Sequence, residues 1–225
     1  MLDRLETLIG KENINKLKKT TVLIIGLGGV GGYALESLVR SGIGKVIIVD
    51  KDIVDITNLN RQIISNKNNI GLNKVDVAEK RIKEISNTEV IKINEFINKE
   101  NIEKLFKEKV DYIIDACDTI ETKKELIRQS IKRNIKIISC MGTAKKMNPE
   151  KLKITEIRKT SYDPIAKIIR KMVRDEKIRQ KIMVVCSDEK PYNRVELGSN
   201  ALVPSSAGIL CASYVINDVV GGLNE

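Results

Sequence analysis

The stretch TVLIIGLGGVGGYALESLVR, residues 21–40, decides the fold class. It begins with a short apolar and β-branched run, Thr21–Ile25, which is typical of a buried strand. A glycine-rich turn follows at once, and helical spacing continues to about residue 41. Gly26, Gly28 and Gly31 match the pattern G-x-G-x-x-G in the strand–turn–helix context that it requires. Glycines there permit a tight turn and let backbone N–H groups approach a phosphate at the positive end of a helix.

Short apolar strands and helices alternate from this stretch to residue 142. Strands are expected at 45–49, 90–93, 110–114 and 136–139, and helices at 3–19, 71–85, 100–108 and 119–134. Strands separated by helices of this length form right-handed β–α–β units in a parallel sheet.

Beyond residue 142 the pattern changes. It predicts a more exposed strand at 151–157, a basic helix from Asp163-Pro164, a strand at 181–186, a polar loop at 187–200 and an apolar helix at 205–220. The predicted fold class is therefore α/β and Rossmann-like, with a mostly parallel sheet, helices on both faces and a mixed C-terminal extension.

The chain contains no internal repeat and no low-complexity linker. We expect a single domain over 1–225, with a nucleotide-binding half at 1–142 and a substrate-binding and C-terminal half at 143–225. No apolar run in the sequence suggests a membrane span and the first residues lack a signal-peptide pattern, so we expect a cytoplasmic protein with no membrane partner.

The content of histidine and cysteine limits the chemistry. There is no histidine, so the commonest general base near neutral pH is missing. The four cysteines, 117, 140, 186 and 211, form no Cys-x-x-Cys pair, and no structural zinc is expected. Catalysis is expected to depend on positioning, on cations and on metal–phosphate electrostatics, or on a carboxylate, lysine or thiol with a shifted pKa.

Positive charge is concentrated in one segment of the chain. The net charge is +10, and residues 145–181 carry 13 Lys or Arg against 5 acids, a net +8. One interpretation is a face that binds a polyanion such as RNA. The other is the generally lysine-rich composition of this chain, and the sequence leaves both open.

Polar side chains follow the predicted strands where a nucleotide would lie. Asp50 ends the second strand, where an acid hydrogen-bonds ribose hydroxyls. Arg61 and Lys74 supply two cations, more than a dinucleotide needs, and they suit a triphosphate attacked at its α-phosphorus. Asn58 is expected to orient ribose or phosphate oxygens, and Asp118 to hold Mg²⁺ through its carboxylate. The predicted nucleotide-binding set is Gly26, Gly28, Gly29, Gly31, Asp50, Asn58, Arg61, Gln62, Lys74 and Asp118.

These motifs together resemble the E1-like (ThiF/MoeB/HesA) superfamily of activating enzymes. The resemblance lies in Arg4…Gly10, the glycine run 26–32, Asp50, TNLNRQ at 57–62, GLNK at 71–74 and DACD at 115–118. It implies a homodimer that uses ATP and Mg²⁺ to adenylate a carboxylate, releasing pyrophosphate. By this resemblance the catalytic residues are Arg61, Lys74, Asp118 and Arg4, and Arg4 reaches the nucleotide of the partner subunit.

Further motifs are similar to one branch of this superfamily, the tRNA threonylcarbamoyladenosine dehydratases. They are RLETLIG at 4–10, TNLNRQ, Asp163-Pro164 before a basic helix, Gly198-Ser199, and Val203-Pro204-Ser205. The implied enzyme is a ligase-type adenylating enzyme. It activates the threonyl carboxylate of the modified adenosine at tRNA position 37, and the carbamoyl group then closes a ring as AMP leaves. Such a closure is intramolecular, so it requires no nucleophile from the enzyme.

Two alternatives remain open at this point. One is an enzyme that adenylates the C-terminal glycine of a ubiquitin-like sulfur-carrier protein, and the other is a non-catalytic protein that senses NAD or ATP. Cys186 is the one cysteine considered as an acyl acceptor, and a sulfur-transfer or redox partner is a further hypothesis. The loop 187–200, with Lys190, Tyr192 and Arg194, is either a substrate-ordered lid or an irregular connection.

Overall fold

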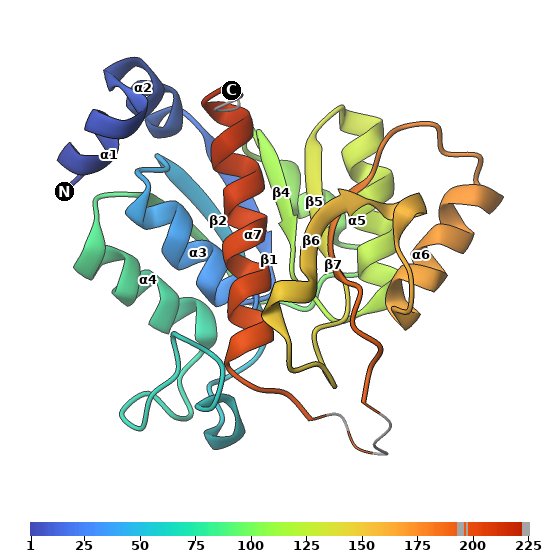
Figure 1. The fold of residues 1–225 in the computed structure, drawn as a ribbon. Coiled ribbons are helices and arrows are strands. Elements are labelled where there is room, and N and C mark those ends of the chain that lie inside the picture. The colour runs from blue at the N-terminus through green and yellow to red at the C-terminus, as the bar shows by residue number, and fades with distance from the viewer. Residues whose placement is uncertain (193–195, 197, 222–225) are drawn as a thin grey trace.

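The computed structural model describes residues 1–192, 196 and 198–221, and this part of the chain contains one seven-stranded sheet (Figure 1). The strand order is β3-β2-β1-β4-β5-β7-β6. The strands are β1 Thr21–Ile25, β2 Lys45–Val49, β3 Glu89–Ile93, β4 Tyr112–Asp115, β5 Lys136–Cys140, β6 Leu152–Glu156 and β7 Met183–Ser187. The order reverses direction between β1 and β4, and in open α/β sheets a ligand binds at such a switch point.

All neighbouring strands pair in parallel except the last two. β6 runs antiparallel to β7, with Leu152 opposite Ser187 and Glu156 opposite Met183. The mixed C-terminal extension is therefore an antiparallel edge strand, and the predicted fold class is confirmed. Strands from both predicted halves of the chain belong to this one sheet, and the division at residue 142 stays a prediction.

Helices cover both faces of the sheet (Figure 1). One face packs against α3, α4 and α7, and the other against α5 and α6. The helices are α1 Asp3–Ile9, α2 Lys11–Lys18, α3 Gly31–Arg40, α4 Lys74–Ile85, α5 Ile120–Arg133, α6 Pro164–Asp175 and α7 Leu202–Val219.

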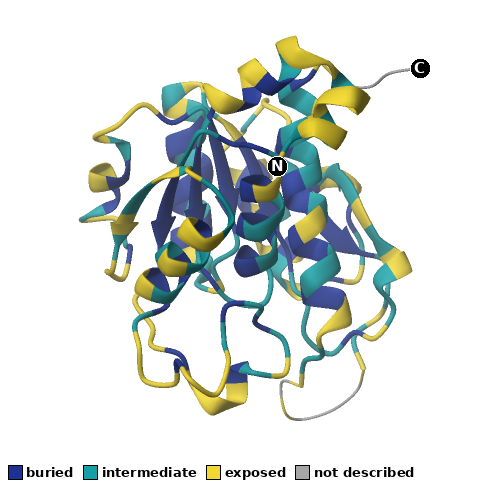
Figure 2. Cartoon of the chain, turned by 90° about the vertical axis from the view of Figure 1, so that its left-hand side faces the viewer, coloured by how far each residue is buried: buried dark blue, intermediate teal, exposed yellow. Residues whose placement is uncertain are grey.

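Alternation along the central strand creates two hydrophobic cores. Val22 and Ile24 face one core, and Leu23 and Ile25 face the other, because successive strand residues point to opposite sides. All four are at most 4% exposed. Figure 2 shows the sheet as the buried centre of the molecule, with exposed residues on the outer surfaces of the helices.

Several predicted boundaries were wrong. The helix expected at 3–19 is two helices, because Gly10 adopts a φ of 80° that interrupts the helix. The helix expected at 71–85 begins only at Lys74, and 100–108 contains a 3₁₀ helix, Ile102–Phe106. The last helix begins at Leu202, and Pro204 lies in its first turn. Proline has no backbone N–H, but it is tolerated there because N–H groups in the first turn of a helix have no intrahelical acceptor.

α7 also corrects the expectation that no segment could span a membrane. By length and composition, this helix is apolar enough to cross a bilayer. Its buried residues, which include Ala207, Cys211 and Val215, belong instead to the core between α7, α3 and the sheet. This packing accounts for part of the apolar composition, since 39% of the helix is buried.

Candidate nucleotide-binding site

A cavity of about 340 Å³ opens at the carboxyl ends of β1, β2 and β4, where the strand order reverses. Its size lies in the range of small-molecule sites. The structure brings most of the predicted set together as lining residues: Gly26, Gly28, Gly29, Asp50, Asn58, Arg61, Gln62, Lys74 and Asp118.

Gly31 is the predicted residue that does not line this cavity. It begins α3, and a Cβ at this position would lie 1.7 Å from the carbonyl oxygen of Gly26. Gly26 itself has a φ of 89°. The role of Gly31 is therefore to let the helix approach the turn closely, which places the start of α3 beside the cavity.

Asp50 fixes the glycine-rich turn. One oxygen of its carboxylate accepts a hydrogen bond from Leu27 N–H at 2.6 Å, and the other accepts from Asp52 N–H at 2.9 Å. The side chain still lines the cavity at the end of β2. It can therefore shape the phosphate-binding turn and face a ribose from the same position.

The two predicted cations of the site are held by different partners, and Lys51 is a third cation in the lining. Arg61 Nη1 donates to Thr57 O at 2.9 Å and to Asn60 Oδ1 at 2.8 Å, which orients the guanidinium without a carboxylate. Lys74, the first residue of α4, is only 4% exposed, and its Nζ lies 3.1 Å from Asp52 Oδ2. Sequence analysis missed Asp52, although its place two residues after the strand-ending Asp50 is a readable signal.

Asn58 and Gln62 lie in the connection between β2 and α4 and are buried. Asn58 ends the 3₁₀ helix Ile56–Asn58, and its Oδ1 accepts a hydrogen bond from Asp55 N–H at 3.1 Å. This contact orders the loop that carries Arg61.

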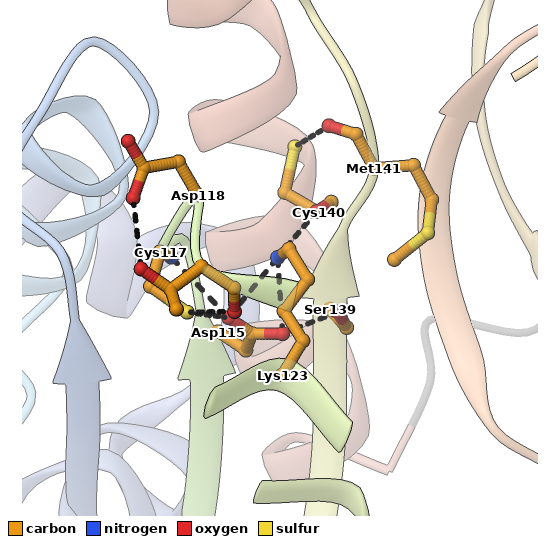
Figure 3. A network of polar contacts seen from close by, with 8 residues as sticks. Asp115, Cys117, Asp118, Lys123, Ser139, Cys140 and Met141 are labelled. Atoms are coloured by element: carbon orange, nitrogen blue, oxygen red, sulfur yellow. Dashed lines mark hydrogen bonds and ion pairs between the residues drawn. The ribbon is translucent and has the colours of Figure 1, made fainter. Parts of the chain in front are cut away.

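Asp118 lies exposed at the turn after β4, above a buried polar network that fixes the turn (Figure 3). Lys123 Nζ lies 3.1 Å from both carboxylate oxygens of Asp115 and 2.8 Å from Cys140 O. Ser139 Oγ and the backbone N–H of Cys117 also donate to Asp115. The side chains of Asp115 and Lys123 are at most 1% exposed. Burial alone lowers the pKa of Lys123, but the adjacent Asp115 carboxylate outweighs it and raises that pKa, so the lysine stays charged.

The opposite ends of the cavity have different character. Near β3, Phe96 is 45% exposed, lies under Lys51 at 5.3 Å from Nζ to the ring centroid, and offers an aromatic face for a base. Sequence analysis missed it, although one of only two phenylalanines follows a predicted strand. From the C-terminal half, Thr143 lines the cavity shortly after β5, Ser199 lies beside Asn60, and Pro204 lies beside Gly29.

Arg4 does not line the cavity of its own chain. It is exposed on α1, and the neighbouring Leu2 packs against Gly42, just before β2 begins. This places Arg4 at the end of the sheet away from the cavity (Figure 1). Its reach to a partner subunit stays a prediction.

The arrangement around Cys186 argues against an acyl-acceptor role. Its side chain is 2% exposed, does not line the cavity, and belongs to the core on the α6 face. Burial, with the nearby Asp163 charge, raises the pKa of Cys186 to about 12, so the reactive thiolate is scarce at neutral pH. In the loop 187–200, Lys190 Nζ lies 5.2 Å from the ring centroid of Tyr162, and Arg194 lies outside the described residues.

Most cations of the basic segment 145–181 are exposed. Lys146 is the main correction, since it is 2% exposed and paired with Asp163. Lys167, Lys171 and Arg174 follow one another at helical spacing on the exposed side of α6. At the end of that helix a groove is lined by Arg158, Arg170, Val173, Arg174, Lys177, Ile178 and Arg179.

Comparison with known proteins identifies the family of the chain. The ThiF family model matches residues 2–163. The tRNA threonylcarbamoyladenosine dehydratase of Bacillus subtilis is 42% identical, covering 96% of this chain and 93% of the relative. The crystal structure of Escherichia coli tRNA N6-threonylcarbamoyladenosine dehydratase in complex with ATP matches with a TM-score of 0.92 at 26% identity, covering 98% of this chain and 93% of that chain.

A relative of another function matches a smaller part. A probable molybdopterin-synthase adenylyltransferase of Porphyra purpurea is 44% identical over 108 residues, which is 48% of this chain and 28% of that protein. The shared part and the larger matches agree on the family. Because the family model matches more than two thirds of its length, this chain belongs to the ThiF family.

Proposed function

We propose that this chain is an ATP-dependent adenylating enzyme that converts tRNA-borne N6-threonylcarbamoyladenosine to its cyclic, dehydrated form. The observation that carries the proposal is the convergence of the glycine turn, Arg61, Lys74 and Asp118 on one cavity at the switch point of the sheet. Near full-length similarity to dehydratases of this modification supports the choice of substrate.

The reaction has two steps that balance without an added oxidant or nucleophile. A threonyl carboxylate oxygen attacks the α-phosphorus of ATP, the bond to the β-phosphate oxygen breaks, and pyrophosphate leaves. The carbamoyl group of the same nucleoside then attacks the activated carbonyl carbon and gives up a proton to solvent, and AMP leaves with one former carboxylate oxygen. The nucleoside has lost the elements of water.

The residues of the site have distinct roles in the first step. The backbone of Gly28 and Gly29 faces the phosphates at the start of α3, where N–H groups and the helix end favour negative charge. Arg61 and Lys74 oppose the charge that grows on the phosphate oxygens and on pyrophosphate. Because the attacking carboxylate is already ionised, the absence of histidine is no obstacle.

Magnesium fits the donors present beside the phosphate turn. Asp50 accepts from backbone N–H groups and Asp52 pairs with Lys74, whereas among the residues that the structure describes the Asp118 carboxylate accepts only a long contact, 3.4 Å, from Thr119 Oγ1. Magnesium is usually bound through one or two carboxylates together with substrate phosphates. Asp118 would therefore hold Mg²⁺, which would neutralise charge on the triphosphate.

The remaining assignments concern partners. The exposed cations of α6 are the surface proposed to bind tRNA, because phosphate neutralisation dominates such affinity. A homodimer would bring Arg4 to the partner's site and would cover Leu202 and Ile209 of α7, which are 55% and 50% exposed. The reaction contains no sulfur or redox step, so a sulfur-transfer or redox partner is not needed for turnover. A cytoplasmic location, as expected from the sequence, is part of this proposal.

A sulfur-carrier substrate is the second candidate, favoured by the similarity of half the chain to a molybdopterin-synthase adenylyltransferase. The chain lacks the Cys-x-x-Cys pairs usual in that group, which favours the tRNA substrate. One experiment separates the two: the protein, ATP and Mg²⁺ are incubated with modified tRNA or with a carrier protein. We expect nucleoside mass spectrometry to show loss of one water from the tRNA nucleoside. Pyrophosphate exchange with the carrier alone would reverse the assignment.

A further inference from the structure

A buried ion pair joins one wall of the cavity to the start of α6. Lys146 Nζ lies 2.8 Å from Asp163 Oδ2 and donates to Gly142 O at 2.6 Å, and both side chains are 1% exposed. The other oxygen of Asp163 accepts from Ala166 N–H at 2.9 Å and so caps α6. One carboxylate therefore fixes both the helix and the chain that follows β5.

The segment that follows β5 is also hydrogen-bonded to the residues that precede α7. Lys145 N–H donates to Gly198 O at 2.9 Å, and Asn200 Nδ2 donates to Lys146 O at 2.6 Å. We call residues 142–148 and 198–200 the acceptor wall. It contributes Thr143 and Ser199 to the lining of the cavity, and Lys146 is the charged residue buried at its base.

The position of the acceptor wall suits the second reactant. Asp50 and Phe96, at the ends of β2 and β3, lie on the nucleotide side of the crevice, whereas residues 142–148 of the wall follow β5 on the other side, and Ser199 joins the wall to Asn60. A ligand at a switch point spans both sides, so the carboxylate that attacks the α-phosphorus is expected beside the wall. The exposed Lys167 and Lys171 lie within the first two turns of the helix that Asp163 begins.

We infer that Lys146 and Asp163 are positioning residues for the tRNA acceptor, an inference that rests on the proposed function. RNA held on α6 is connected through Asp163 and Lys146 to the wall beside the reacting carboxylate. A buried ion pair loses hydration on folding and is often no more stabilising than apolar residues. It does impose one fixed geometry, and a misplacement of about 1 Å can cost about 10²-fold in rate.

The test is the double variant Lys146→Met/Asp163→Asn, which removes both charges while the asparagine keeps an oxygen to cap α6. We expect kcat/KM for modified tRNA to fall by about 10²-fold, with an unchanged Kd for ATP and a retained melting transition. A control is Lys136→Met/Asp218→Asn, which makes the same two substitutions in a more exposed pair, at 2.6 Å between β5 and α7 at the far end of the sheet. The control is expected to keep kcat/KM for both substrates.

The single variant Asp163→Asn provides a second measurement, taken below its own melting transition. It is expected to raise KM for tRNA and to leave KM for ATP unchanged. Equal changes in the two KM values, or wild-type kinetics in the folded double variant, would overturn the inference. A wild-type chain that forms no cyclic nucleoside would instead refute the proposed function, so the two failures are distinguishable.

Discussion

On the nucleotide side of the cavity, several key contacts join residues that are close in the sequence, whereas on the acceptor side they join distant ones. Arg61 donates to Thr57, four residues away, and Asn58 accepts from Asp55, three residues away. On the acceptor side, Asn200 Nδ2 donates to Lys146 O, 54 residues away, and the two sides meet where Asn60 Nδ2 donates to Ser199 O, 139 residues away. The nucleotide side is thus built by local motifs, and the acceptor side exists only when the C-terminal half has folded onto the sheet.

The difference suggests that the two sides of the cavity have different roles. Short-range contacts order the loop that carries the cations before any partner arrives. Long-range contacts fix the acceptor wall relative to the basic helix α6. The position of the wall is therefore expected to be coupled to the binding of a large substrate on α6. We expect substitutions on the nucleotide side to change ATP chemistry and substitutions on the acceptor side to change the use of tRNA.

The largest effect is expected from Lys123→Met, beneath Asp118. It leaves the Asp115 carboxylate buried without its cation, which typically costs about 3–5 kcal/mol of the free energy of unfolding. Chemical denaturation measures this loss. The double variant Lys123→Met/Asp115→Asn is expected to recover much of it, and equal stability of the single and double variants would show that the pair is not coupled.

Arg61→Ala is expected to have the next largest effect, on turnover alone. Removal of a donor to developing charge costs about 10²–10³ in kcat, and the half-buried side chain belongs to neither hydrophobic core. AMP release with modified tRNA gives the rate, and circular dichroism verifies the fold. A near-normal rate would show that Arg61 does not take part in the reaction and would contradict the role proposed for the nucleotide side of the cavity.

A smaller effect, confined to tRNA, is expected from the triple variant Lys167→Ala/Lys171→Ala/Arg174→Ala. If each cation neutralises one phosphate, the slope of log affinity against log salt becomes less steep by about three. The control is Lys18→Ala/Lys80→Ala/Lys83→Ala, on helices away from α6. An equal change of slope in both variants would indicate a general attraction between positive charge and RNA. It would contradict the assignment of tRNA binding to α6 on the acceptor side.

The smallest effect is expected from Cys186→Ala. Because the thiol is buried away from the cavity and its pKa is raised to about 12, turnover should stay at the wild-type level with a modest loss of stability. Rates are compared at a temperature at which both proteins are folded. Complete loss of cyclisation would require a thioester route and a revised acceptor side.

The same contrast explains what the sequence could predict. The glycine turn, Asp50, Arg61 and Lys74 belong to local motifs, and they meet at strand ends because parallel strands share one edge. Lys146 was counted among surface charges, since nothing near it in the sequence reveals that Asp163 folds over it. Thr143 and Ser199 were not recognised as neighbours, because their proximity depends on how β7 and α7 pack. Gly31 was assigned to phosphate, although its position serves the packing of α3 on Gly26.

The central claim is that a substrate carboxylate attacks the α-phosphorus of ATP in this cavity. The most direct measurement uses modified tRNA whose threonyl carboxylate carries oxygen-18, incubated with the protein, ATP and Mg²⁺. We predict that the AMP released carries one heavy oxygen and that pyrophosphate carries none. Unlabelled AMP, or heavy oxygen in inorganic phosphate formed together with ADP, would contradict the account.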